Sequence, residues 1–318
     1  MDGDKIKHIL LAENSLEGIL SAVSYAYRSR YGHGFNEIMI AGEEGTMKLF
    51  SEYIDIPSDP EAAGKVYRAI RSKLGLNFLE YIEYCALSCF DDRAEVIYRA
   101  LILGFANNID ILNYRKADCI SRLHEIYKNV QGEVHHWTEF LRFKIHDITE
   151  LTGTNAETEG DRGMTEVPGE MQTGIVGSGH APAVFDEYSS AEQYRQYAAN
   201  QFLTSVIEPR HRIVSLLLPF FEDRYPSENF LIYDKVHDEA AVYSAGKGGY
   251  VAQRLSELQP EIVRIIASDN SENARVSDLW KIFYDTTFIK ERENRALQRS
   301  LLPLRFRGDM AEHKGRRE

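Results

Sequence analysis

Residues 133–143, EVHHWTEFLRF, bring together the side chains best suited to acid–base chemistry in this sequence. If the stretch begins as a helix, Glu133 and His136 lie three residues apart on one face, and His135 and Glu139 lie four apart on an adjoining face. A carboxylate beside an imidazole can exchange protons with a substrate. The Glu-x-x-His spacing can also offer two metal ligands, but di-iron bundles repeat this unit and the sequence has it once. We therefore favour a histidine–carboxylate network at a helix-to-strand junction over a metal site.

A second polar group follows an apolar stretch in IYDKVHDE, residues 232–239. Asp234 and His237 would serve as an orienting carboxylate and a general base if the fold brought them to His135 or His136. The sequence does not fix that distance. Turn residues that simply end a strand are the alternative for both positions.

Arginines form a third group, with the chemistry of phosphate or partner contact. Arg142 stands in the apolar frame FLRF, and EPRHRIV places two arginines where a helix is expected to begin. Residues 281–318 hold ten Lys or Arg against six Asp or Glu, a local balance of +4. A solvated helix and tail would explain the same charges. The candidate nucleic-acid or partner contacts are Arg142, Arg210, Arg212, Arg299, Arg305 and Arg307.

The negative charge of the chain is concentrated in one stretch. The formal net charge is −12, and residues 147–193 hold ten acidic side chains against the single base Arg162. This stretch has few aromatic residues and many Gly, Thr and Glu, so it offers too little apolar surface to offset chain entropy. We expect a long acidic disordered insertion at about residues 149–195, and the rest of the chain is close to neutral.

Composition places the chain among ordinary globular proteins, with 43% hydrophobic and 27% charged residues. Neither a membrane span nor a secretory signal is expected from its apolar runs, so we predict a cytoplasmic protein. The three cysteines, Cys85, Cys89 and Cys119, give neither a disulfide framework nor a C-x-x-C pair. Cys85 and Cys89 are four apart, and we expect both to be buried on one helical face.

The positions of apolar residues predict an α+β fold, with a helical layer packed on a mostly antiparallel β-sheet. Strands are expected at residues 5–12, 37–42, 53–57, 140–147, 202–208, 229–236, 240–246 and 250–255, and helices at 15–30, 58–74 and throughout about 75–140. A cap at Ser58 or Asp59 followed by Pro60 marks one helix start. Residues 140–147 and 202–208 should pair across the insertion, and a helix near 211–226 should cross the sheet. We predict one α+β domain over 1–254 and a helical segment with a basic tail over 255–318.

Four segments resemble a bacterial family of DNA-metabolism proteins whose biochemical activity is unknown. They are ALSCFDDRAEVIYRALILGF, NVQGEVHHWTEFLRF, IEPRHRIVSLLLPFFEDRYPSENFLIYDKVHDEAAVY and LWKIFYDTTFIKERENRALQRSLLPLRFR. Members are encoded beside a radical-SAM protein similar to spore photoproduct lyase, and some are fused to a uracil-DNA-glycosylase-like domain. Phe220 stands where this family often has histidine, which argues against a metal or catalytic role there. Phe230 stands where tryptophan is common.

The resemblance implies an accessory protein for DNA repair or modification that works with a radical-SAM partner. The iron–sulfur cluster and S-adenosylmethionine would belong to that partner, because this chain lacks the cysteines to hold a cluster. The rival hypothesis is an enzyme, a hydrolase or glycosylase-like protein acting on a nucleotide or DNA base. Its acid–base site would consist of Glu133, His135, His136, Asp234 and His237. A structural scaffold is a third hypothesis, in which changes to this cluster would alter stability alone.

Overall fold

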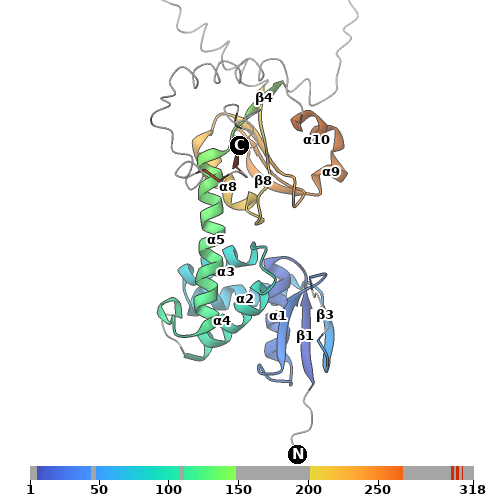
Figure 1. The fold of residues 1–318 in the computed structure, drawn as a ribbon, viewed down its shortest axis with the longest axis vertical. Helices are drawn as coiled ribbons and strands as arrows, with labels where there is room; N and C mark the ends of the chain where they lie inside the picture. The colour runs from blue at the N-terminus through green and yellow to red at the C-terminus, as the bar shows by residue number, and fades with distance from the viewer. Residues whose placement is uncertain are drawn as a thin grey trace, which may run out of the picture.

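The computed structural model describes residues 6–43, 48–107, 111–147 and 201–267, together with positions 302, 303, 306, 307 and 310. Two lobes are joined by one long helix (Figure 1). The N-terminal lobe contains β1 (Lys7–Ala12), α1 (Leu16–Arg28), β2 (Asn36–Ile40), β3 (Ser51–Ile56), α2 (Pro60–Lys73), α3 (Leu76–Ala86), α4 (Arg93–Asn107) and the short 3-10 turn η1 (Ile111–Asn113). The C-terminal lobe contains β4 (Lys144–Asp147), β5 (Gln201–Ile207), α8 (Val214–Arg224), β6 (Asn229–Asp234), β7 (Glu239–Ser244), β8 (Gly248–Gln253), α9 (Leu255–Leu258) and α10 (Pro260–Ala267). The joining helix is α5 (Asp118–Phe140).

The first sheet is wholly parallel, in the order β2-β1-β3. Parallel neighbours need a crossover connection, and α1 supplies it between β1 and β2. Leu10 of β1 lies beside Ile38 of β2 and Ile54 of β3, and its side chain is fully buried. Apolar residues in this central strand therefore anchor the sheet against the helices.

Helix starts in the N-terminal lobe follow the capping residues of the sequence. The Ser15 hydroxyl accepts a hydrogen bond from the amide of Gly18 at 2.9 Å, at the start of α1. Asp59 accepts from the amides of residues 61 and 62 at 3.0 and 3.1 Å, and Pro60 occupies the first turn of α2. Each cap satisfies amides that have no partner inside the helix, so both predicted helix starts are confirmed.

Helix α5 contributes to two separate hydrophobic cores. With 23 residues it is about 35 Å long at 1.5 Å per residue. Its first half buries Ile120 and Leu123 against the helices and sheet of the N-terminal lobe. Its second half buries Val130 and Trp137 against α8 and the second sheet. The helix thus ties the lobes together, and the extent of one folding unit over residues 1–254 stays a prediction.

The second sheet has the order β4-β5-β6-β7-β8. β4 pairs with β5 in antiparallel fashion, as predicted for the strands that flank the acidic insertion. β5 and β6 are parallel, and the remaining pairs are antiparallel. Helix α8 connects β5 to β6, and a strand–helix–strand connection of this kind brings neighbouring strands into parallel alignment.

The α+β class is confirmed, whereas the mostly antiparallel sheet is confirmed only in part. Within the described ranges, two sheets replace the single expected one, and three of the six strand pairings are parallel. The prediction followed the hairpins β6–β7–β8 and gave too little weight to the helices that cross between β1 and β2 and between β5 and β6. The predicted acidic insertion lies outside the described residues, as do most of the predicted C-terminal segment and the basic tail.

The prediction of a shared buried face for two cysteines is half wrong. Cys85 is fully buried within α3, and burial raises the pKa of its thiol. Cys89 is exposed because α3 ends at Ala86, so the helical periodicity no longer applies. Cys119 at the start of α5 is partly buried.

Candidate functional site

Glu133 faces inward from α5 and binds the loop that follows β5. Its side chain is buried, and its carboxylate accepts hydrogen bonds from the amides of Arg210 at 3.1 Å and His211 at 2.8 Å. The His211 ring in turn accepts from the amide of Cys89 through Nδ1 at 3.1 Å. A buried carboxylate is stable where amides donate to it, so Glu133 fixes the position of this loop. The contact between His211 and Cys89 then ties the loop to the N-terminal lobe.

The two adjacent histidines of α5 have different surroundings. His135 is exposed, and its Nε2 lies 3.1 Å from the carboxylate of Glu139. His136 is partly buried, with Nδ1 at 2.5 Å from the carbonyl of Gly132. The same ring stacks on Phe306 with centroids 5.1 Å apart. The two imidazoles and Glu133 therefore contact three different sets of groups.

Asp234 and His237 lie together at the turn between β6 and β7. The Asp234 side chain is fully buried, and its Oδ1 accepts from the amides of Val236 at 2.9 Å and His237 at 3.1 Å. Its Oδ2 lies 2.6 Å from His237 Nδ1, while the imidazole keeps 19% of its surface exposed. With Nδ1 protonated toward the carboxylate, Nε2 is left to accept a proton, which is the arrangement of an oriented general base.

A second carboxylate lies beside this pair on the same turn. Asp238 accepts from the Tyr233 hydroxyl at 3.0 Å and from the Ser256 hydroxyl at 2.6 Å. Burial and the contact with Asp238 raise the pKa of Tyr233 to about 12, so this phenol stays protonated near neutral pH. Burial opposes ionisation of Asp238, yet these hydrogen bonds keep the pKa of its carboxyl below the usual range. The turn is thus a firmly held polar group at the carboxyl end of β6.

The arginines predicted to contact DNA or a partner differ in their exposure and in the groups that they bind. Arg142 and Arg210 are exposed, and neither forms an ion pair with an acidic side chain in the described part of the chain. Arg212 pairs with Glu239. Arg307 is buried and donates to the carbonyl of Leu302 from Nε at 3.1 Å and Nη2 at 3.0 Å. Arg299 and Arg305 lie outside the described residues.

Arg93 and Arg212 meet at what we call the inter-lobe junction, formed by Asn14, Glu43, Arg93, Arg212 and Glu239. The Arg93 guanidinium is buried and donates to Glu43 at 2.7 and 2.9 Å and to Asn14 Oδ1 at 2.8 Å. Arg212 donates to the carbonyl of Asn14 at 2.5 Å and to Glu239 at 3.1 Å. Open parallel sheets bind ligands outside the carboxyl ends of their strands, and here the chain's own arginines occupy that position.

Sequence reasoning missed most of this junction. Arg93 is separated from Asn14 and Glu43 by 79 and 50 positions, so no local spacing relates them. It also missed YAYRSRY, residues 25–31, where tyrosines and arginines alternate at the end of α1. That alternation was a usable signal, because aromatic and basic side chains together are typical of nucleic-acid contacts.

Comparison with known proteins assigns the chain to a family. A sequence model described as "Domain of unknown function (DUF4130)" matches residues 91–158 and 185–312, more than half of the chain. This α+β protein, with its parallel and mixed sheets, belongs to the DUF4130 family. Comparison with curated proteins gave no match, and neither did comparison with solved structures.

Two further observations concern metals and membranes. Among the described residues, no group of three or more His, Cys, Asp or Glu side chains is placed to hold a metal ion. None of the described helices combines the length and the apolar character that crossing a bilayer requires.

Proposed function

We propose that this protein is an accessory factor in DNA repair or modification and works with a radical-SAM enzyme. In this proposal the partner holds the iron–sulfur cluster and S-adenosylmethionine, and this chain contributes contacts to DNA and to the partner. The family resemblance of the sequence suggests the pathway. The observation that carries the proposal is the exposure of Arg142 and Arg210 without a described ion-pair partner.

The surroundings of Arg210 favour a binding role for its side chain. The Glu133 carboxylate holds the amides of residues 210 and 211, so the backbone that carries this guanidinium is fixed before any ligand arrives. A pre-positioned guanidinium loses less entropy on binding a phosphate than one on a mobile loop. In this proposal the acidic insertion limits nonspecific DNA association or contacts the partner.

Arg212 and Arg307 have a different role in this proposal, because both already bind groups of the protein. Their guanidinium groups already donate to Glu239 and to the carbonyl of Leu302. We propose that they position the surrounding backbone for the interface. Arg299 and Arg305 stay candidate contacts from the sequence.

The first test is DNA binding as a function of salt. Each phosphate contact on duplex DNA contributes about 0.9 to the slope of log K against log salt. The double variant Arg142→Ala, Arg210→Ala should therefore lower this slope by roughly 2 and weaken binding, if each arginine meets one phosphate. Arg71→Ala, at an exposed arginine on α2, is the matched control and should leave the slope unchanged.

The second test is association with the radical-SAM protein of the same organism. Co-purification of the two proteins, followed by iron and sulfide analysis of each separated chain, should place the cluster in the partner. Absence of any association with both DNA and that enzyme would remove the basis of the proposal.

The Asp234–His237 pair favours a second candidate function, that of an enzyme acting on a nucleotide or DNA base. The 2.6 Å contact orients an imidazole at the carboxyl end of a strand, where its Nε2 can accept a proton. Hydrolysis or base release from oligonucleotides with modified bases should then be lost in His237→Gln and kept in His135→Gln, whose imidazole is exposed. Equal activity of the two variants would rule out His237 as the base.

A further inference from the structure

A hollow opens at the end of α1, at the opposite end of the parallel sheet from the inter-lobe junction. It has a volume of about 480 Å³ and is lined by Tyr25, Arg28, Ser29, Arg30 and Tyr31. We call it the Tyr–Arg hollow. Its volume falls within the range of about 300–1,000 Å³ found for small-molecule sites. Two guanidinium groups and two phenol rings in one hollow suit a ligand that is both anionic and aromatic.

The two arginines of the hollow are available for an anion. Arg28 and Arg30 are exposed, and neither pairs with an acidic side chain among the residues that the structure describes. Elsewhere in the same lobe Arg93 binds Glu43 and Arg99 binds Glu95. A pair of guanidinium groups without a carboxylate leaves a local positive potential that attracts phosphate.

Tyr31 provides a flat aromatic surface beside this charge. One side of its ring stacks on His8, with centroids 3.5 Å apart and an interplanar angle of 21°. The residue nevertheless stays 43% exposed. His8 is itself buried in β1, with its Nδ1 3.2 Å from the Glu52 carboxylate, so the ring that supports Tyr31 belongs to a paired strand of the sheet. A base can stack on an aromatic ring of this kind whatever its sequence, because every base has a π-face.

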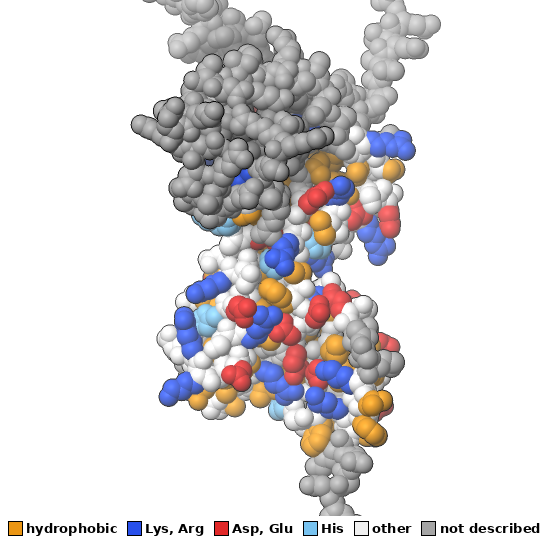
Figure 2. Space-filling view, in the orientation of Figure 1, with side chains coloured by type: hydrophobic (Ala, Val, Ile, Leu, Met, Phe, Trp, Pro, Cys, Tyr) orange, Lys and Arg blue, Asp and Glu red, His pale blue; other side chains and the backbone are white. Residues whose placement is uncertain are grey.

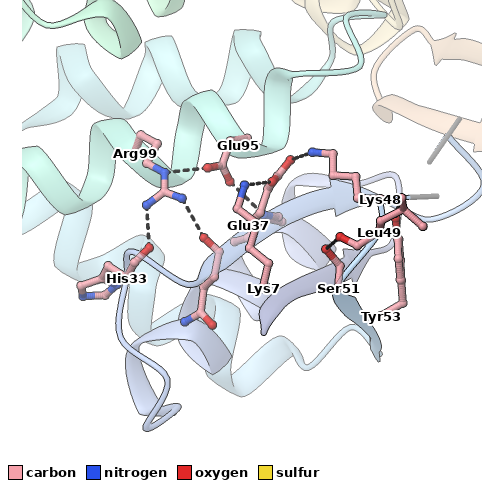
Figure 3. A network of polar contacts seen from close by, with 11 residues as sticks. Lys7, His33, Glu37, Lys48, Leu49, Ser51, Tyr53, Glu95 and Arg99 are labelled. Atoms are coloured by element: carbon pink, nitrogen blue, oxygen red, sulfur yellow. Dashed lines mark hydrogen bonds and ion pairs between the residues drawn. The ribbon is translucent and has the colours of Figure 1, made fainter. Parts of the chain in front are cut away.

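The backbone that carries the hollow is rigidly held, as Figure 3 shows for the neighbouring contacts. Arg99 donates to the carbonyls of His33 and Asn36, each at 2.7 Å, and to Glu95 at 2.6 Å. The Asn36 side chain donates to the Ser29 hydroxyl at 2.9 Å. The two ends of the segment 29–36 are thus bound to each other, and Arg99 ties the segment to α4. A site held in this way is preorganised for its ligand.

Apolar side chains extend the surface at the same end of the sheet, where β1 and β3 begin. Ile6, Leu49 and Phe50 are 52%, 85% and 84% exposed. The amide of Lys7 donates to the carbonyl of Phe50 at 3.3 Å, and Lys7 precedes His8 in β1, so these apolar residues lie near the start of that strand. In Figure 2, basic, histidine and hydrophobic side chains lie next to one another at the lower end of the N-terminal lobe. Single-stranded nucleic acid presents apolar bases and charged phosphates in turn. Exposed apolar side chains close to two arginines can contact both kinds of group.

We propose that the Tyr–Arg hollow binds an unpaired nucleotide of single-stranded DNA. The base stacks on the open side of Tyr31, and the flanking phosphates bind Arg28 and Arg30. Single-stranded DNA is favoured over duplex because a ring can stack on a base only when the base is out of the double helix. The inference rests on the proposed function for the choice of DNA as the nucleic acid. The hollow lies outside the residues matched by the family model, so it adds a second contact region to that proposal.

The test measures binding of a labelled oligothymidylate of about a dozen nucleotides to the full chain, within the site sizes known for single-strand binders. Tyr31→Ala should weaken binding about 5- to 150-fold, the effect of losing one stacked base, while Tyr31→Phe should retain it. Arg28→Ala with Arg30→Ala should lower the salt slope by about 1.4, at roughly 0.7 per phosphate of a single strand. A 2-aminopurine base in the strand should lose its stacking-dependent quenching with Tyr31→Ala only.

Tyr114→Ala is the matched control, because Tyr114 is also 43% exposed and lies outside the hollow. Unchanged affinity of Tyr31→Ala, or a loss equal to that of Tyr114→Ala, overturns the hollow proposal and leaves the proposed function standing if Arg142→Ala, Arg210→Ala still weakens binding. No binding of either single or double strands overturns the hollow proposal, and the proposed function fails with it if the radical-SAM protein does not associate with the chain either. A dimer in solution that dissociates with Tyr31→Ala, without DNA binding, assigns the surface to self-association and overturns the proposal as well.

Discussion

Replacing Arg93 by methionine tests how strongly the inter-lobe junction is held together. The guanidinium is 1% exposed and makes four hydrogen bonds, to Glu43 at 2.7 and 2.9 Å, to Asn14 at 2.8 Å and to the carbonyl of Phe90 at 2.8 Å. Methionine keeps an unbranched apolar side chain, shorter than that of arginine, and removes all four bonds. Glu43 and Asn14 then lose their hydrogen bonds to a charged group. Water can replace those bonds only in part, because the site is largely buried.

The magnitude follows from the burial of the two partners. Removing one member of a buried ion pair costs about 3–5 kcal/mol, because the other charge is left uncompensated. Glu43 is 32% exposed and can be rehydrated in part, so we expect about 3 kcal/mol for Arg93→Met, at the lower end of this range. With a urea dependence of about 2 kcal/mol per molar, the unfolding midpoint should fall by roughly 1.5 M.

Arg122→Met is the control for this measurement. Arg122 also makes a two-point contact with a carboxylate, at 2.8 and 3.1 Å to Asp92, but the two side chains are 29% and 46% exposed. Exposed pairs contribute about 0.2–1 kcal/mol, so the control should lose much less stability. Urea unfolding followed by far-UV circular dichroism measures both variants. If Arg93→Met costs no more than Arg122→Met, burial is not what makes the junction strong and the reasoning fails.

Glu133→Gln should lower the free energy of unfolding by about 1–3 kcal/mol, because a neutral amide accepts less strongly from the two backbone amides that the carboxylate now binds. Chemical denaturation measures this, and Glu139→Gln, at an exposed carboxylate, should change stability by less than about 0.5 kcal/mol. Burial holds the pKa of His33 below its ordinary value of 6.5, so the stability it contributes is present above about pH 6.5 and is lost as the pH falls through the lower folded value. His33→Gln should therefore reduce the loss of stability between about pH 7 and pH 5, and an unchanged profile of the urea midpoint against pH would show that His33 does not titrate in this way.

Much of the local structure was predictable from the sequence because its causes are local. Ser15 and Asp59 bind amides two or three positions ahead, so the starts of α1 and α2 follow from neighbouring residues. The end of α5 at Phe140 coincides with the change from a helical to an alternating apolar pattern. Asp234 and His237 are also local partners, since they lie three positions apart on one turn.

The arrangement of these elements was decided by contacts between distant residues. The parallel alignment of β5 and β6 depends on the packing of α8 across the sheet, which apolar spacing alone does not specify. The inward position of Glu133 and the exposed position of His135 depend on which face of α5 meets the loop after β5.

The sequence by itself therefore determined the α+β class, most of the helices and strands, and the short-range polar pairs, because backbone capping and side-chain periodicity act over a few residues. Only the tertiary structure decided that Arg93 and Arg212 both donate to Asn14, at the carboxyl end of a parallel sheet. It also decided that Tyr31 stacks on His8 and leaves two arginines open beside it. Such groups are joined by the folding of the chain over many residues, and the burial that makes them strong exists only once the lobes have packed.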